Sequence, residues 1–297
     1  MCSLTTSEFQ QVGTKAMKKW IFLCLFVAGF AGQTKAQQAP IVANRQAESN
    51  FAFEVKTIDE FIERFNNDQY TLIRQYLEAN FPQKKFSRYD LVRTLFNYED
   101  PLWDKELAAQ FVGEVCDSTN EKFLDFYSDT WYAQAECLVK YKGVPKKVTI
   151  TLQVFVSDRT GAAKWVVCGA RAPFLDFSKR LDPKKFLNPI SHATDFIGLK
   201  KAMEDKMFVR NYLTERFQES HLNKYLAAVS TGDIVFQQIN SVTYHFLSLD
   251  NWLFTVKEYI RPGRNSGWLI QTLTRRTQVE KQDYLKNVLF CDEVSSR

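Results

Sequence analysis

The sequence predicts an α+β protein made of two tandem repeats, each with N-terminal helices packed on a curved antiparallel sheet. Two observations lead to this prediction. In each half of the chain, segments with apolar residues at helical spacing precede segments in which apolar and polar residues alternate. Short sequence matches between the halves also occur in the same order. The composition, with 45% hydrophobic and 25% charged residues, excludes disordered, collagen-like and low-complexity classes.

Residues 1–36 have the pattern of a secretory signal peptide. Met17, which we take as the start, is followed by two lysines and then by an apolar run from Trp20 to Phe30. Small and polar residues lead to Ala36, where we expect cleavage. The apolar run is shorter than the roughly 20 residues that span a bilayer. The pattern therefore predicts an exported protein, periplasmic or secreted, without a membrane span.

The net charge gives little information about partners once this leader is removed. Four lysines and one glutamate in residues 1–36 carry +3 of the formal +5, which leaves +2 on residues 37–297. A nucleic-acid-binding surface needs basic residues that are concentrated on one face and not balanced elsewhere in the domain. The sequence therefore predicts no nucleic-acid partner.

Three predicted helices open each repeat, after a linker at residues 37–55. Thr57 and Glu60 have the spacing of a capping box, in which each side chain accepts a hydrogen bond from the other residue's backbone N–H. Apolar residues at helical spacing follow within residues 58–65, 72–77 and 91–96. The equivalent helices of the second half are expected at residues 194–205, 207–217 and 221–229.

Three strands follow the helices in each repeat. Between Lys147 and Val156 every second residue is apolar, which predicts a strand with one apolar face. We expect strands at residues 130–142, 147–156 and 163–172, and again at 233–249, 251–260 and 267–276. The first repeat thus spans residues 56–173. A linker at 174–190 separates it from the second repeat, which spans 191–297 and includes a C-terminal tail.

The two repeats match at offsets that differ by 33 between the helices and the strands, so we expect the second half to lack about 33 residues, within the part that corresponds to 97–130. The residues Arg74, Tyr76 and Leu77 recur 136 positions later as Arg210, Tyr212 and Leu213. Turn-rich hairpins precede Trp165 and Trp268, which are 103 positions apart. At that offset the apolar faces of the preceding strands disagree by one residue, and one slip turns a whole strand over. We therefore expect the two hairpins to differ in length by one residue.

This element order resembles the nuclear-transport-factor-like (cystatin-like cone) superfamily. The resemblance is carried by the helix openings at 59–65 and 194–199, the matched Arg–Tyr–Leu segments and the strands at Trp165 and Trp268. It implies a curved sheet that wraps a helix and leaves a pocket. The superfamily includes isomerases, dehydratases, small-ligand binders and protein-docking modules, so the fold alone implies no single function. Tandem copies also resemble exported proteins of an uncharacterised bacterial type.

Candidate catalytic residues are few. No GxSxG, GxGxxG, Walker-loop or HExxH pattern occurs, and nothing in the sequence indicates a cofactor or a metal site. His245, on a predicted strand between Tyr244 and Phe246, is the candidate general base if a carboxylate orients it. The alternative is a hydrogen-bonded packing residue. The first repeat has no histidine, which disfavours a duplicated enzyme.

Aromatic residues on the predicted strands are the candidates for ligand binding. Tyr and Trp combine an apolar body with a polar group and are favoured in pockets and interfaces. Because side chains alternate along a strand, neighbours such as Trp131 and Tyr132 must face opposite sides of the sheet. The alternative for the whole set is core filling. The candidates are Trp131, Tyr132, Trp165, Tyr244, Trp252, Tyr259 and Trp268.

Four cysteines follow the leader. An exported protein permits disulfides, and Cys116 with Cys137 is a pairing that the sequence leaves open. Cys137 and Cys168 are expected on strands with one strand between them, which is too far for a bridge. Buried free thiols are the alternative, and Cys291 has no assigned pairing.

The sequence as a whole favours an exported, non-enzymatic tandem-domain protein that binds a small apolar ligand or an envelope protein. The two repeats could then pack as an intramolecular pseudo-dimer. One alternative is a small-molecule isomerase or hydrolyase, which requires His245 in a cavity with a carboxylate. The other is a structural envelope component whose sheets are filled by side chains. A binder requires an aromatic-lined cavity or an exposed apolar patch.

Overall fold

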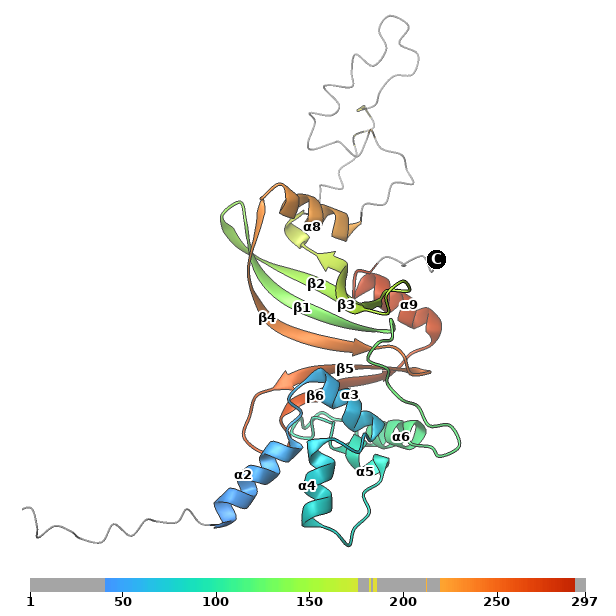
Figure 1. Ribbon diagram of the computed structural model, residues 1–297. Coiled ribbons are helices and arrows are strands. Elements are labelled where there is room, and N and C mark those ends of the chain that lie inside the picture. Colours follow the sequence, from blue (N-terminus) through green and yellow to red (C-terminus); the bar gives the residue numbers. More distant parts are fainter. Residues whose placement is uncertain (1–40, 176–181, 183, 186–211, 213–219, 292–297) are drawn as a thin grey trace, which may run out of the picture. The chain divides into compact units, whose positions relative to one another are not determined.

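Helices cover both faces of one antiparallel sheet (Figure 1). The computed structural model describes residues 41–175, 182, 184–185, 212 and 220–291, with side chains from residue 45 onward. Within these residues the predicted α+β class is confirmed. The chain divides into two compact units, Met1–Ala47 and Glu48–Arg297, and the unit Glu48–Arg297 is described by itself. The predicted signal peptide and, apart from residue 212, the predicted helices at 194–205 and 207–217 lie outside the described residues.

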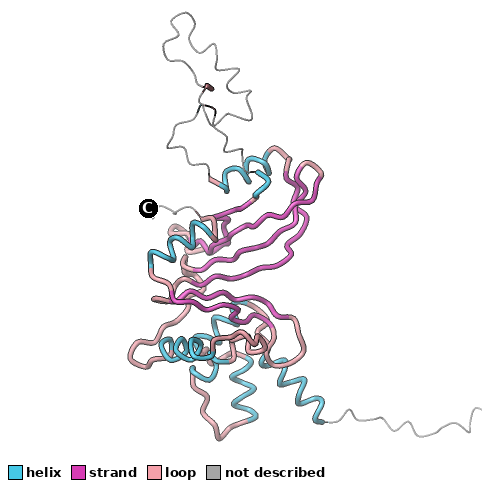
Figure 2. The backbone as a smooth tube through the Cα atoms, turned by 180° about the vertical axis from the view of Figure 1, so that it is seen from behind, coloured by secondary structure: helices cyan, strands magenta, loops and turns pink. Residues whose placement is uncertain are grey.

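Each of the six described strands begins and ends within three residues of its predicted range. Their order in the sheet is β3-β2-β1-β4-β5-β6, and every neighbouring pair is antiparallel. Figure 2 shows them side by side in one continuous sheet. The expectation of a separate sheet for each repeat is therefore wrong, because β1 pairs with β4 along nearly its whole length. The strands are β1 (Trp131–Tyr141), β2 (Val144–Val156), β3 (Ala163–Arg171), β4 (Ile234–Phe246), β5 (Trp252–Tyr259) and β6 (Gly267–Arg275).

A β-bulge interrupts the third strand of each half. Cys168 is the extra residue in β3, and Gln271 is the extra residue in β6. A bulge bends its strand and re-aims the side chains around it. The two bulges lie at matching places in the two halves, at the same offset of 103 that separates Trp165 from Trp268.

The two hairpins that precede these bulges differ in length. Trp165 of β3 pairs with Val154, 11 positions before it, whereas Trp268 of β6 pairs with Glu258, 10 positions before it. The one-residue difference expected from the sequence is therefore confirmed.

The helices of the first half begin earlier than the sequence predicts. The region interpreted as a linker at 37–55 contains α2, because Ala, Gln and Glu favour helix there although no apolar stripe marks it. The Thr57 side chain accepts from the Glu60 N–H, as the capping box predicts, but the Glu60 carboxylate accepts from Lys56 N instead. The helices are α2 (Ile41–Phe53), α3 (Ile58–Asn66), α4 (Leu72–Asn80), α5 (Arg88–Arg93) and α6 (Lys105–Val115).

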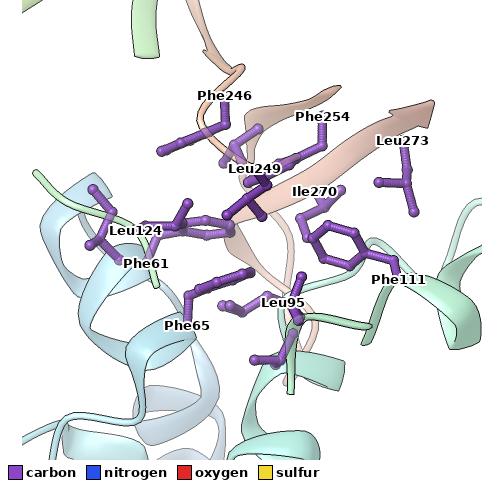
Figure 3. Packing of buried hydrophobic residues seen from close by; sticks show 14 of the residues in the cluster. Phe61, Phe65, Leu95, Phe111, Leu124, Phe246, Leu249, Phe254, Ile270 and Leu273 are labelled. Atoms are coloured by element: carbon purple, nitrogen blue, oxygen red, sulfur yellow. The ribbon is translucent and has the colours of Figure 1, made fainter. Parts of the chain in front are cut away.

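The largest hydrophobic cluster joins helices of the first half mainly to strands of the second (Figure 3). Phe61 and Phe65 of α3 stack on Phe246 and Phe254, with ring centroids 5.8 Å and 6.3 Å apart respectively. Phe111 of α6 meets the Phe254 ring edge-on at 5.6 Å. Rings from β4, β5 and the helices thus fill the space between these layers.

Helix α8 (His221–Ser230) makes the converse contact. Its residues Tyr225 and Ala228 pack mainly with β1, β2 and β3, against side chains such as Ala135, Ile150 and Ala170. On this side of the sheet the described helices of each half therefore pack mainly on strands of the other half. We call the side of the sheet that packs against α3, α6 and α8 the helix face.

The opposite side of the sheet is covered by a helix that the sequence assigned to a C-terminal tail. Helix α9 (Gln278–Asn287) opens with a capping box between Thr277 and Glu280. Tyr284 and Leu285 of α9 pack in a small cluster on this side. The buried members of the cluster are Tyr132, Leu247, Leu253, Leu289 and Cys291. We call this side the α9 face.

Buried cations tie the loops between these elements together. Arg64 is fully buried and donates to the carbonyls of Ala52, Phe53 and Glu54 at the end of α2. Arg88 donates to the carbonyls of Phe65, Val115 and Lys122, and so joins the ends of α3 and α6. Charge-assisted hydrogen bonds of this kind satisfy carbonyls that a helix end leaves unpaired.

Candidate binding face

Four of the predicted ligand-binding aromatics form a row across the helix face. Trp131 lies at its centre, with its ring centroid 5.1 Å from Trp165 and 5.8 Å from Tyr244. The Tyr244 ring is in turn 4.8 Å from Trp268. We call these four residues the aromatic row. Since they come from β3, β1, β4 and β6, the row extends from one edge strand to the other.

The row is anchored in the core and open at one end. Trp131 is buried, and it stacks on Phe246 at 5.2 Å with the ring planes only 4° apart. Trp165 is 39% exposed, and Val167, two residues further along β3 on the same face, is 43% exposed. Tyr244 and Trp268 are half-buried. An exposed indole held by buried rings is a suitable surface for an aromatic or apolar ligand.

Two carboxylates lie at the other end of the row. Glu258 pairs directly with Trp268 across β5 and β6 and is exposed. Asp59 belongs to the first turn of α3. Burial raises the pKa of the Tyr244 phenol, and the negative charges of Asp59 and Glu258 raise it further. This end of the row is therefore electronegative.

The other three predicted aromatics do not join the row. Trp252 is fully buried, donates from its indole N–H to Glu114 at 2.8 Å and lies under the Arg275 guanidinium. Tyr132 is buried on the α9 face, which confirms that it and Trp131 point to opposite sides. Tyr259 is half-buried beside Arg261. Core filling accounts for Trp252 and Tyr132.

His245 lies on the α9 face, away from the aromatic row. It is 4% exposed, and its Nδ1 is 2.9 Å from the Tyr284 hydroxyl of α9. Burial lowers its pKa from 6.5 to about 4. Its Nε2 has no hydrogen-bond partner within the described part of the chain. A phenol therefore occupies the place that the enzyme hypothesis gave to a carboxylate, and the imidazole is neutral at neutral pH.

The cysteines are placed differently from the pairing considered above. Cys116 ends α6 and packs against the first hydrophobic cluster, whereas Cys137 is buried on β1 in the cluster under α8. Both are free thiols. The two side chains belong to different layers of packing, so they do not form the pair. Cys168 instead approaches Cys291, with the two Sγ atoms 2.7 Å apart.

The described side chains include no group of three or more His, Cys, Asp or Glu that could hold a metal ion. None of the described helices is long and apolar enough to cross a bilayer. Comparisons of the chain with protein-family models, with curated proteins and with solved structures found no match.

Several residues of this face and of the α9 face were not found from the sequence. Glu258 and Val167 gain their place from strand pairing, which local patterns do not encode. Helix α9 had a readable signal, because Thr277 and Glu280 have capping-box spacing. Its residues 278–287 are mostly polar, however, and carry no apolar stripe that would identify a packed helix.

Proposed function

We propose that this protein is an exported, non-enzymatic binding protein of the cell envelope that holds a small aromatic or apolar ligand on the aromatic row. The observation that carries the proposal is the exposed Trp165 indole at the end of a continuous line of four rings. Buried Trp131 holds this indole in place, so little conformational entropy is lost when a ligand stacks on it.

We further propose that the chain is an internal duplication of a nuclear-transport-factor-like unit, with its halves joined as an intramolecular pseudo-dimer. The strand order supports this proposal, because it reads the same when β1, β2 and β3 are exchanged with β4, β5 and β6. The matching bulges at Cys168 and Gln271 support it independently. A closed two-fold arrangement is the commonest way in which two similar units associate.

Over residues 131–135 and 242–246 the β1–β4 register is compatible with such a two-fold relation, as any evenly paired antiparallel ladder is. Ala133 of β1 and Tyr244 of β4 are paired. If the two halves are exchanged so that each of these residues takes the other's place, the same pair results. The same exchange turns the pair of Trp131 and Phe246 into the pair of Ala135 and Val242, which is also present. On this interpretation Trp165 and Trp268 are equivalent residues at opposite ends of the aromatic row. Only Trp165 is substantially exposed, so the first half provides the open end.

The charge near the row indicates the ligand class. Glu258 and Asp59 place two carboxylates near Tyr244 and Trp268, and aromatic faces attract cations as well. The ligand that we propose is therefore elongated: it stacks on Trp165 and carries a positive charge on the part that extends toward these carboxylates. An anionic molecule of similar shape would be disfavoured by both effects.

Two fluorescent dyes test the proposal on the purified chain. Thioflavin T is a cationic aromatic dye, and 8-anilinonaphthalene-1-sulfonate is an anionic one. We expect wild-type protein to bind thioflavin T more tightly and the Trp165→Ala variant to bind it about fivefold more weakly, since a stacked ring contributes about 1 kcal/mol. The Glu258→Gln variant should weaken thioflavin T binding without weakening binding of the anionic dye.

Phe155→Ala is the matched control for this experiment. Phe155 is 48% exposed and lies on the same hairpin, but its side chain points to the opposite face of the sheet from Trp165. Its removal should therefore leave the dye affinity unchanged. Equal losses in both variants, or no binding of either dye, would overturn the binding role of the row. Equal affinity for the two dyes would overturn the preference for a cation.

Export is tested separately from binding. A bacterium that expresses the full chain is fractionated, and the N-terminus of the envelope form is sequenced. We expect it to begin at Gln37, after removal of residues 1–36. Glutamate in place of both Lys18 and Lys19 should retain the protein in the cytosol. An uncleaved chain that stays in the cytosol of the wild-type strain would contradict export.

A further inference from the structure

Cys168 and Cys291 come together on the α9 face although 123 positions separate them in the chain. Their Sγ atoms lie 2.7 Å apart. Cys168 is half-buried and Cys291 is buried, and both belong to the apolar cluster that contains Tyr132 and Leu289. The contact is thus sheltered, and Cys168 is the more exposed of the two residues.

Alternation along β3 places Cys168 on this face, because Val167 before it lies on the helix face, and the bulge brings Gly169 to the same side. The pairing in β3 shifts at the bulge, so Gly169 pairs with Thr151, whose side chain points to the α9 face. The C-terminal segment lies directly over Gly169. A Cβ atom on that residue would be 2.6 Å from the Leu289 carbonyl oxygen. Glycine therefore permits the close approach that places Cys291 beside Cys168.

Hydrogen bonds hold this C-terminal segment on the sheet independently of the sulfurs. Gln134 of β1 donates to the Val288 carbonyl at 2.8 Å, and Thr151 of β2 donates to the Leu289 carbonyl at 2.7 Å. Cys291 itself forms an antiparallel bridge with Gly169 of β3. Three strands thus fix the backbone on which Cys291 is carried.

We propose that Cys168 and Cys291 form a disulfide bond in the exported protein. Disulfides require closely spaced backbones and facing side chains, and the antiparallel bridge beside Cys168 supplies both. The bond would fasten the segment after α9 to the edge strand β3. It would thereby cover the backbone of that edge and keep α9 over His245.

The oxidation requires an external disulfide as the electron acceptor. The more accessible Cys168 thiolate attacks a sulfur of the donor disulfide and releases one donor thiol. The Cys291 thiolate then attacks the Cys168 sulfur of this mixed disulfide and releases the second donor thiol. The protein loses two protons and two electrons, and the donor gains them. A thiol–disulfide oxidoreductase of an exporting compartment, or oxidised glutathione in vitro, is the chemical class of donor.

The test uses the full chain, purified under reducing conditions and then exposed to oxidised glutathione. Remaining thiols are alkylated in denaturant, and the chain is digested without reductant for mass spectrometry. We expect a peptide pair that joins Cys168 to Cys291 and disappears on reduction. Cys116 and Cys137 should be recovered alkylated. Because the donor is added in vitro, the result does not depend on export or on the ligand.

Serine variants provide matched controls. Cys168→Ser and Cys291→Ser should each abolish the cross-linked peptide, whereas Cys137→Ser should leave its yield unchanged. If either serine variant fails to fold, the wild-type peptide map alone decides the question. Alkylation of both Cys168 and Cys291 in the oxidised wild-type protein would overturn the proposal. A stable mixed disulfide at Cys168 that never transfers to Cys291 would overturn it as well.

Discussion

Acid should lower the free energy of unfolding of this protein through one buried histidine. His245 has a pKa of about 4 in the folded protein, against an ordinary value of 6.5, and the cause is burial. The unfolded chain therefore binds a proton in a pH range where the folded protein does not. The contribution of neutral His245 is complete above pH 6.5 and is lost as pH falls from 6.5 towards 4.

The size of the loss follows from the two pKa values. Linkage gives about 2 kcal/mol at pH 5 and about 3 kcal/mol at pH 4, relative to neutral pH. Other groups also titrate in this range, so the effect must be isolated by comparison with a variant. His245→Asn keeps a polar atom near Nδ1 to meet the Tyr284 hydroxyl but does not titrate.

The assay is urea unfolding of wild-type protein and His245→Asn at several pH values. Between pH 7.5 and pH 5 the wild-type protein should lose about 2 kcal/mol more of its free energy of unfolding than the variant. The imidazole resonances of folded wild-type protein should also stay constant over this range. Parallel stability curves, or an imidazole that titrates near its ordinary value, would refute the reasoning. Either result would also revive His245 as a general base, which needs a pKa near the working pH.

Three further predictions concern stability and use chemical unfolding. If Cys168 and Cys291 are joined, the bond closes a loop of 123 positions. The free energy of unfolding of the oxidised protein should then exceed that of the reduced protein by about 5 kcal/mol on the chain-entropy model. A difference below about 1 kcal/mol would count against the cross-link. Arg88→Met should cost at least about 3 kcal/mol, because it leaves the buried carbonyls of Phe65 and Val115 without their donor. Exposed Arg159→Met is its control and should change stability by less than about 0.5 kcal/mol. Gly169→Ala should cost about 2 kcal/mol or more and lower the yield of the cross-linked peptide, since its Cβ would meet the backbone of Leu289 and Phe290. Gly113→Ala, in open space on α6, should be neutral or stabilising by up to about 1 kcal/mol, and equal costs at the two glycines would exclude the steric explanation.

The strands could be predicted closely because their evidence is local. In β2 the period-two pattern marks the apolar face, and Val148, Ile150 and Val154 are indeed buried on it. The same reasoning separates Trp131 from Tyr132. Each of these predictions depends only on alternation along one strand, and alternation is a property of the backbone itself.

The pairing between distant strands could not be predicted in the same way. Whether β1 pairs with β4 depends on two edges that are about 100 positions apart, and neither sequence carries a mark of its partner. The approach of Cys168 to Cys291 has the same origin. It depends on a bulge, on a glycine and on the path of the chain after α9, none of which shows as a local pattern.

For a related reason, the sequence predicted which residues form the candidate site but not which of them are exposed. The aromatic residues were identified as a set, and alternation assigned neighbours to opposite faces. Which of them remain exposed depends on where helices cover the sheet. Trp252 is covered by α6 and its neighbours, whereas Trp165 lies beyond the helices on β3. Coverage is a tertiary property, so exposure could not be derived from the strand patterns.

The exchange of helices between the halves links the fold to the proposed binding face. Phe254 and Val256 of β5 pack with α3 and α6, and Ala135 and Ile150 of β1 and β2 pack with α8. On the helix face each half therefore covers mainly strands of the other half, whereas α9 packs on residues of its own half such as His245 and Leu253. The aromatic row has the same division, with Trp165 and Trp131 from the first half and Tyr244 and Trp268 from the second. Since Trp131 orders its neighbours only when β1 is paired with β4, the row exists only in the assembled sheet. On the proposed duplication, this surface lies between two similar units, and neither unit contains it alone.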